Sequence, residues 1–129
     1  MAEVRAQSVV RPSEGVRYVT AIVDQIGTSA SPSTIYTAPA NHVGLIRSIT
    51  ISNANAASRN VTVTTIRNSV TGTPSDIWVD ADALDGNSVI QLFDLGHTNA
   101  TDVIEAFASS ASSVDVTLFI EEYQFQSGL

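Results

Sequence analysis

The sequence predicts an all-β protein, an antiparallel two-sheet β-sandwich of jelly-roll-like topology with about seven to eight strands. Two observations predict this fold. Val, Ile and Thr occur 15, 11 and 13 times against 6 Leu, and β-branched side chains fit a pleated sheet better than a helix. Small and polar residues also interrupt the apolar segments about every 8–12 residues, which is typical of the turns in a sandwich.

Residues 114–123 show the alternation of a half-buried strand most clearly. The face expected to point away from the core carries Phe119 and Tyr123 beside acidic and hydroxyl side chains. The expected core face is entirely apolar and consists of Val114, Val116, Leu118 and Ile120. A period of two predicts one face on a core and one face toward solvent.

Residues 43–53 form the second clear strand. Their alternation predicts a core face made of Val43, Leu45, Ile49 and Ile51. Arg47 falls on this apolar face, so we expect it to lie near an edge, to reach outward or to pair with a carboxylate. Residues 60–67 follow after a short turn, and the two strands are expected to form an antiparallel hairpin.

The remaining strands are shorter. They are expected at residues 16–24, 34–37, 76–80, 88–94 and 102–109. Residues 88–94 carry apolar side chains on both faces, which indicates burial on both sides. Residues 81–87 and 95–101 are expected to be turns. The pattern predicts no helix and no domain linker, so residues 16–129 are expected to form a single sandwich domain.

The charge balance and the missing residue types exclude several functions. The net charge of −7 argues against a surface for nucleic acid or anionic membranes. The chain has neither Cys nor Lys, which excludes disulfides, thiolate metal sites, Cys nucleophiles, Schiff bases and Lys-containing phosphate loops. No segment resembles a signal peptide or a membrane helix. We therefore expect no cofactor, no nucleic-acid or membrane partner, and a binding or structural role rather than an enzyme.

Two groups of side chains are the candidates for chemistry. His42 and His97 each lie beside a turn, and an enzyme would need one of them to face a carboxylate in a cleft. Asp80, Asp82 and Asp85 resemble a calcium loop, but the EF-hand pattern needs acids at alternate positions followed directly by Gly. The alternative is a solvated acidic loop whose Asp side chains make turns.

The arginines are unevenly placed. Residues 1–15 have neither a strand nor a helix period and are expected to form an extended N-terminal arm. Arg5, Arg11 and Arg17 make this end of an acidic chain positive. We expect the arm to lie across the acidic surface of a neighbouring subunit and to set its register, the alternative being a solvated tail.

Trp78, the single Trp, is the other candidate interaction residue. Between Asp76 and Asp80, its ring offers a platform on which a sugar could stack. The alternative is a Trp packed at a sheet edge or in an interface.

Residues 35–53, with the sequence IYTAPANHVGLIRSITISN, resemble a pattern in small β-sandwich virion proteins of tailed bacteriophages. In that pattern a Tyr-Thr-x-Pro turn leads into a long alternating strand that ends in Asn. Residues 60–67, 102–110 and 114–122 resemble the next, the penultimate and the closing strand of the pattern. The resemblance implies a sandwich subunit that decorates or cements a capsid, forms a head fibre or sits in a tail.

The resemblance and the composition together predict a non-enzymatic virion structural protein, a capsid decoration (cement) protein made in the host cytoplasm. We expect it to form a homo-oligomer, a trimer as in many such proteins, and to bind the major capsid protein or another virion protein. The alternative is a receptor- or glycan-binding module of a fibre or tail, with an exposed aromatic platform around Trp78 or Tyr36.

Overall fold

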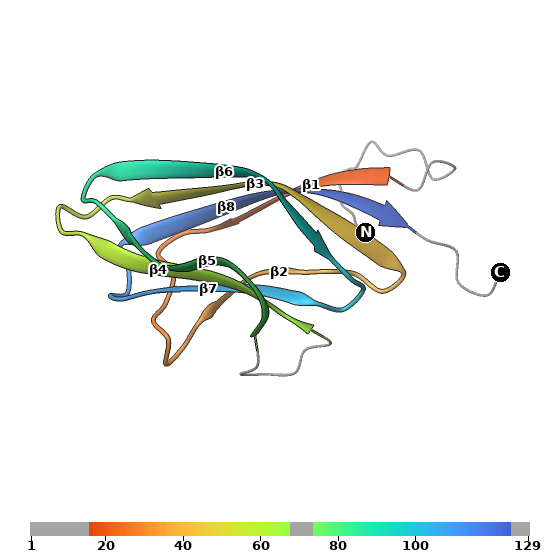
Figure 1. Ribbon diagram of the computed structural model, residues 1–129, viewed down its shortest axis with the longest axis horizontal. Helices are drawn as coiled ribbons and strands as arrows, with labels where there is room; N and C mark the ends of the chain where they lie inside the picture. The colour runs from red at the N-terminus through yellow and green to blue at the C-terminus, as the bar shows by residue number, and fades with distance from the viewer. Residues whose placement is uncertain (1–15, 68–73, 125–129) are drawn as a thin grey trace.

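The computed structural model describes residues 16–67 and 74–124, which form eight strands in two sheets (Figure 1). The predicted arm, residues 1–15 with Arg5 and Arg11, lies outside the described residues. The strands are β1 (Val16–Val23), β2 (Ser33–Thr37), β3 (His42–Asn53), β4 (Arg59–Ile66), β5 (Pro74–Leu84), β6 (Ser88–Thr98), β7 (Val103–Ala108) and β8 (Val114–Gln124).

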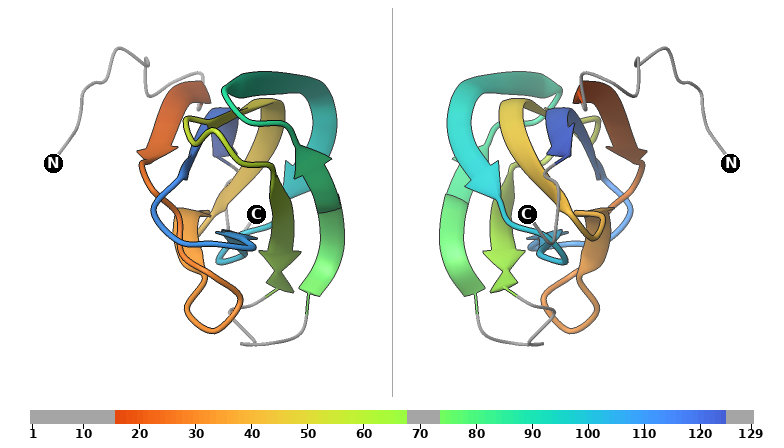
Figure 2. Two further views of the ribbon diagram at one scale, coloured as in Figure 1. Left: turned by 90° about the vertical axis from the view of Figure 1, so that its left-hand side faces the viewer. Right: turned by 90° about the vertical axis from the view of Figure 1, so that its right-hand side faces the viewer.

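The pairing of the strands is nested. β1 pairs with β8, β2 with β7, β3 with β6 and β4 with β5, and all of these pairs are antiparallel. The chain is therefore one long hairpin that folds over into two layers, ordered β1-β8-β3-β6 and β2-β7-β4-β5 (Figures 1 and 2). This is the strand order of an eight-stranded jelly roll, which confirms the predicted fold class.

The hydrophobic core lies between the inner faces of the two layers. The predicted apolar face of β8 is completely buried there, as is Ile104 of β7, the strand expected within residues 102–109. β-branched side chains from both layers fill most of the remaining space: Ile46, Ile49, Ile51, Val61 and Val63. Among the described residues no helix is long and apolar enough to cross a membrane.

The predicted hairpin of residues 43–53 and 60–67 is wrong, because β3 and β4 belong to different sheets. The short connection between them crosses from one layer to the other at the end of the sandwich. Asn53, only 1% exposed, holds this crossing: its side-chain amide donates to the backbone oxygens of Ala57, Leu84 and Asp85 at 2.9, 3.1 and 3.1 Å. Loop length alone does not distinguish such a crossing from a hairpin.

The predicted core face of β3 is wrong in its first half. Gly44 and Ile46 point into the core before Arg47, and Ile49 and Ile51 point into it afterwards. The register of β3 shifts between Ile46 and Ser48 against both neighbouring strands, so Arg47 is the extra residue of a β-bulge relative to β8. The bulge moves Val43 and Leu45 to the outer face.

Two predicted turns are partly strand. β5 continues to Leu84 because its pairing with β4 extends to Arg59. β6 continues to Thr98 because it pairs with β3 as far as Gly44. Within β6, Asp94 adopts a φ of 51°, so the strand passes through a local irregularity where the sequence indicates a turn.

Candidate contact surface

The outer face of the β1-β8-β3-β6 sheet gathers the exposed hydrophobic side chains. Seven large hydrophobic residues are exposed among those that the structure describes, and six of them lie on these strands: Tyr18, Ile22, Val89, Phe93, Phe119 and Tyr123. The seventh, Ile77, lies on β5 in the other sheet. We call the outer face with these six residues the aromatic face.

The strand register places these side chains in rows across the sheet. Thr20 of β1, Phe119 of β8, Ser48 of β3 and Phe93 of β6 lie opposite one another in succession. Tyr18 stacks on Phe119, with ring centroids 6.2 Å apart and planes 11° apart. Such offset stacking fixes two rings as a rigid, partly apolar platform.

Arg47 forms the charged centre of the aromatic face. Its Nε and Nη2 lie 2.9 and 2.7 Å from Oε1 of Glu121, and its Nη1 lies 3.3 Å from Oδ1 of Asp94. Of the three alternatives expected for Arg47, the structure shows the pairing with a carboxylate. The bulge makes this geometry possible because it turns Arg47 away from the core.

The same network sets the protonation of Glu121. Burial raises the pKa of its carboxyl, but hydrogen bonds from Arg47, Tyr123 and Tyr18 outweigh this and hold the pKa below its usual range. The hydrogen bond to Glu121 in turn raises the pKa of Tyr123. The carboxylate, the guanidinium and two phenol hydroxyls thus form one connected group on the surface.

A second polar group lies inside the sandwich. Glu122 is 1% exposed and accepts hydrogen bonds from Nε and Nη2 of Arg17 at 2.8 and 2.5 Å and from the hydroxyl of Tyr36 at 2.5 Å. Burial, followed by the hydrogen bond to Glu122, raises the pKa of Tyr36 far above its usual value. Arg17 therefore lies in β1, not in the arm, and its side chain is bound within its own subunit.

The two aromatic residues expected to form a glycan platform are not open. Tyr36 is 7% exposed. Trp78 is half-buried, donates its indole N–H to Oγ1 of Thr65 at 2.7 Å, and packs against the core cluster. It is the extra residue between the pairs Val63–Val79 and Thr64–Ile77, and its ring lies against Gly96 of β6.

The acidic segment is mainly strand. Asp80 and Asp82 both belong to β5, and only Asp85 lies in the turn that follows. The backbone oxygen of Asp85 accepts hydrogen bonds from Asn53 and from Ser88. The side chain of Asp82 lies outside those that the structure describes, and among the described side chains no three His, Asp or Glu residues are grouped so that they could hold a metal ion.

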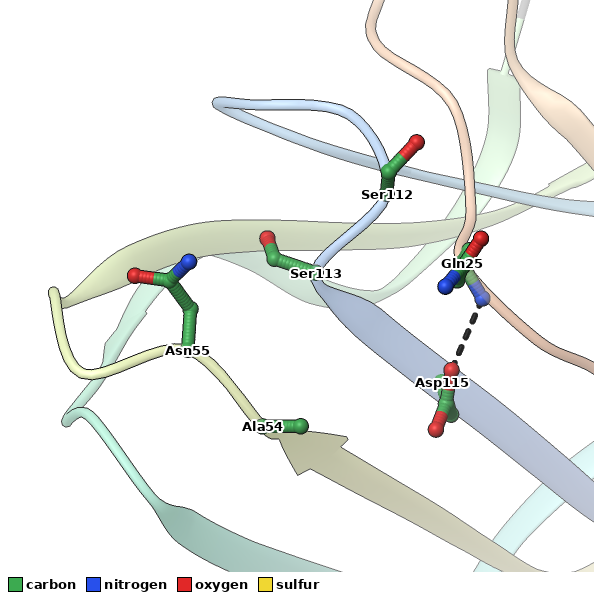
Figure 3. Close-up of a pocket in the computed structure, with 6 residues that line it drawn as sticks. All are labelled: Gln25, Ala54, Asn55, Ser112, Ser113 and Asp115. Carbon is green, nitrogen blue, oxygen red and sulfur yellow. Dashed lines mark hydrogen bonds between the residues drawn. The ribbon is translucent and has the colours of Figure 1, made fainter.

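The two histidines lie on neighbouring strands: His42 begins β3, and His97 of β6 lies opposite Leu45 of β3. His97 is exposed on β6, and Nδ1 of His42 lies 2.8 Å from the carbonyl oxygen of Ala40. An open hollow of about 130 Å³ lies elsewhere, at the end of the sandwich between the loops after β1, β3 and β7 (Figure 3). Gln25 and Asp115 line it and are joined by a backbone-to-carboxylate hydrogen bond of 2.7 Å.

Sequence reasoning missed most of the aromatic face. The signal was present in residues 88–94, where both faces are apolar and burial on both sides was expected. That expectation is wrong for the chain alone: Ile90 and Leu92 pack on the core, but Val89 and Phe93 are 63% and 62% exposed. The outward positions of β1 carry a weaker form of the same signal, in Tyr18 and Ile22.

Comparisons with known proteins bear on the fold. No protein-family model and no curated protein sequence matches the chain. The chain is similar to one in the crystal structure of the T13 IBDV viral particle, with a TM-score of 0.52 and 11% identity, over 88% of this chain and 32% of that one. This chain therefore spans about a third of the length of that neighbour, and the likeness shows a shared β fold.

Two further structures are similar at lower scores. One belongs to the capsid of Ralstonia phage GP4, with a TM-score of 0.49 and 9% identity over 95% of this chain and 93% of that one. The other belongs to infectious bursal disease virus strain Gx, with a TM-score of 0.43 and 11% identity over 88% and 37%.

Proposed function

We propose that this chain is a non-enzymatic structural protein of a phage virion, a capsid decoration (cement) protein that oligomerises and binds the capsid shell. The observation that carries the proposal is the aromatic face on a jelly-roll sandwich. A large apolar patch on a soluble domain marks an interaction site. The phage-like pattern in residues 34–122 supports a virion role, as does the fold shared with a chain of a viral particle.

The physical basis of such a role is contact. Tyr, Phe and Arg are enriched in protein interfaces and dominate their binding energy, and Lys is depleted there. The aromatic face has this composition, with an Arg between rings in a chain that has no Lys. A subunit of this kind stabilises a shell by linking neighbouring capsid subunits, and a trimer is the oligomer that we expect from the phage resemblance.

The copy number per particle tests the proposal. Quantitative mass spectrometry of purified particles from the source phage, with the major capsid protein as internal standard, is expected to find hundreds of copies. A dozen or fewer would place the protein in the tail or at a vertex and refute the decoration role. Its absence from particles would refute the virion role altogether.

The second candidate is a receptor- or glycan-binding module of a fibre or tail. The open stack of Tyr18 on Phe119 favours it, because exposed aromatic rings on a flat sheet also bind sugar rings. A glycan array distinguishes the two candidates. Specific hits that disappear in the variant Phe119→Ala would support the glycan-binding module, and an array without hits would count against it.

A further inference from the structure

We propose that the aromatic face is the contact between copies of this chain, so that the subunit uses other surfaces to bind the shell. This inference rests on the proposed function and names the partner of its surface. Four observations support a second copy as the occupant: the two-sided apolar character of β6, the charges around Arg47, the regular edge strand β1, and the size of the face.

The sequence of β6 fits a strand that is covered on both sides. Ile90 and Leu92 face the core, and Val89 and Phe93 face outward from the same sheet. A partner that buries Phe93 gives this strand the environment that its composition indicates. A second copy is one partner that is available wherever the subunit is made.

The charges on the face complement those of a copy. The whole chain is acidic, with 13 acidic residues against 6 basic ones, so two copies repel each other where their acidic surfaces meet. On the aromatic face Arg47 lies between Glu121 and Asp94, and both signs are therefore present side by side. The side chain of Asp94 is 72% exposed and its oxygen is 3.3 Å from Arg47, so it is free to meet Arg47 of the second copy instead.

The face also reaches β1, which has the most regular pairing of the four described edge strands. β1 pairs with β8 over eight residue pairs without a register shift. The other three edge strands are interrupted: β2 is five residues long with one shift, β5 shifts three times against β4, and β6 shifts opposite Arg47. Interrupted or short edges resist pairing with other chains, whereas long regular ones invite it. A copy seated on Tyr18 and Ile22 lies directly beside this edge.

The size of the face suits a stable contact. Four strands about 4.8 Å apart, each about seven residues long at about 3.3 Å per residue, give a projected area of about 450 Å². A standard interface takes about 800 Å² of accessible surface from each partner, so this face and its protruding rings supply more than half of it. The area of a standard interface, about 800 Å² per partner, is about an eighth of the 6774 Å² accessible surface of the chain.

Light scattering coupled to size-exclusion chromatography tests the inference. The variants Phe93→Arg and Tyr18→Arg place a charge at the two opposite edges of the face, and Ile77→Arg is the matched control because Ile77 is 54% exposed on the other sheet. We expect an oligomer for the wild type and for Ile77→Arg. Both face variants should dissociate, with the dissociation constant raised about 30-fold or more, and should keep the circular dichroism spectrum of the wild type.

A monomeric wild type would overturn the inference, and so would face variants that stay oligomeric. Sedimentation of each protein with particles that lack it separates this result from the proposed function. If the face variants are monomers and the wild type does not bind particles, the inference stands and the decoration role fails. If the face variants remain oligomers but no longer bind particles, the aromatic face is the shell contact and the inference fails.

Discussion

The buried hydrogen bond between Tyr36 and Glu122 should make a measurable contribution to the free energy of unfolding. The substitution Tyr36→Phe removes one hydroxyl that is 2.5 Å from a carboxylate oxygen of a residue only 1% exposed. A hydrogen bond to a charged group contributes about 1.5–3 kcal/mol. Because Glu122 keeps both hydrogen bonds from Arg17, we expect a loss of about 2 kcal/mol in the free energy of unfolding at pH 7.

The loss should depend on pH in a defined direction. The pKa of Tyr36 is raised in the folded chain above its usual value of 10.0. Its contribution is therefore complete below pH 10 and falls above it, because the unfolded chain then releases a proton that the folded chain keeps. The wild type should lose about 1.4 kcal/mol more than the variant between pH 9 and pH 11, so the difference between them shrinks to about 0.6 kcal/mol.

Urea denaturation at one fixed protein concentration, followed by circular dichroism from pH 7 to pH 11, measures both effects. Thr37→Val is the control, because it removes an exposed hydroxyl next to Tyr36 in β2 and should change stability by less than about 0.5 kcal/mol. The reasoning is refuted if Tyr36→Phe costs no more than this control at pH 7, or if the gap between Tyr36→Phe and the wild type stays constant up to pH 11.

Three further outcomes are expected. Gly96→Ala should destabilise the fold by at least about 2 kcal/mol in thermal denaturation. The added Cβ would lie 2.8 Å from the Trp78 ring, and the φ of 152° at Gly96 is one that other residues rarely adopt. An unchanged melting temperature would contradict this. Asn53→Ala should cost about 2–3 kcal/mol in urea denaturation, because it leaves the loop carbonyls that Asn53 binds without a donor, and a loss under about 0.5 kcal/mol would contradict that role. Calcium and a chelator should give the same melting temperature, whereas a clear rise with calcium would indicate a metal site.

The core of the sandwich can be predicted from the sequence wherever apolar and polar residues alternate without interruption along a strand. β8 keeps its period of two from Val114 to Ile120, and its predicted core face is the observed one. β3 does not, because the bulge at Arg47 shifts the period by one residue. A bulge depends on what the two neighbouring strands offer, which is information that a single strand does not carry.

The candidate surface is harder to predict, because it depends on which strands become neighbours. Phe119 and Tyr123 are visible as outward residues of one strand. They lie on one surface with Tyr18 and Phe93 only because the strand order is β1-β8-β3-β6, which brings together segments from both ends and the middle of the chain. The sequence also does not predict how far the Trp78 ring is exposed, because this depends on Gly96 of the other sheet, which lies against the ring.

The nested pairing also dictates when the molecule can fold during synthesis. Of the strands that the structure describes, β1 is made first, and its neighbour in the sheet is β8, which is made last. Until β8 has been made, the apolar residues of β1 lack the described strand with which they pair, although β4 and β5 can already meet. A chain that stops before residue 114 has lost the strand that joins β1 to β3. Truncated products of this protein should consequently be prone to aggregation rather than merely weakened.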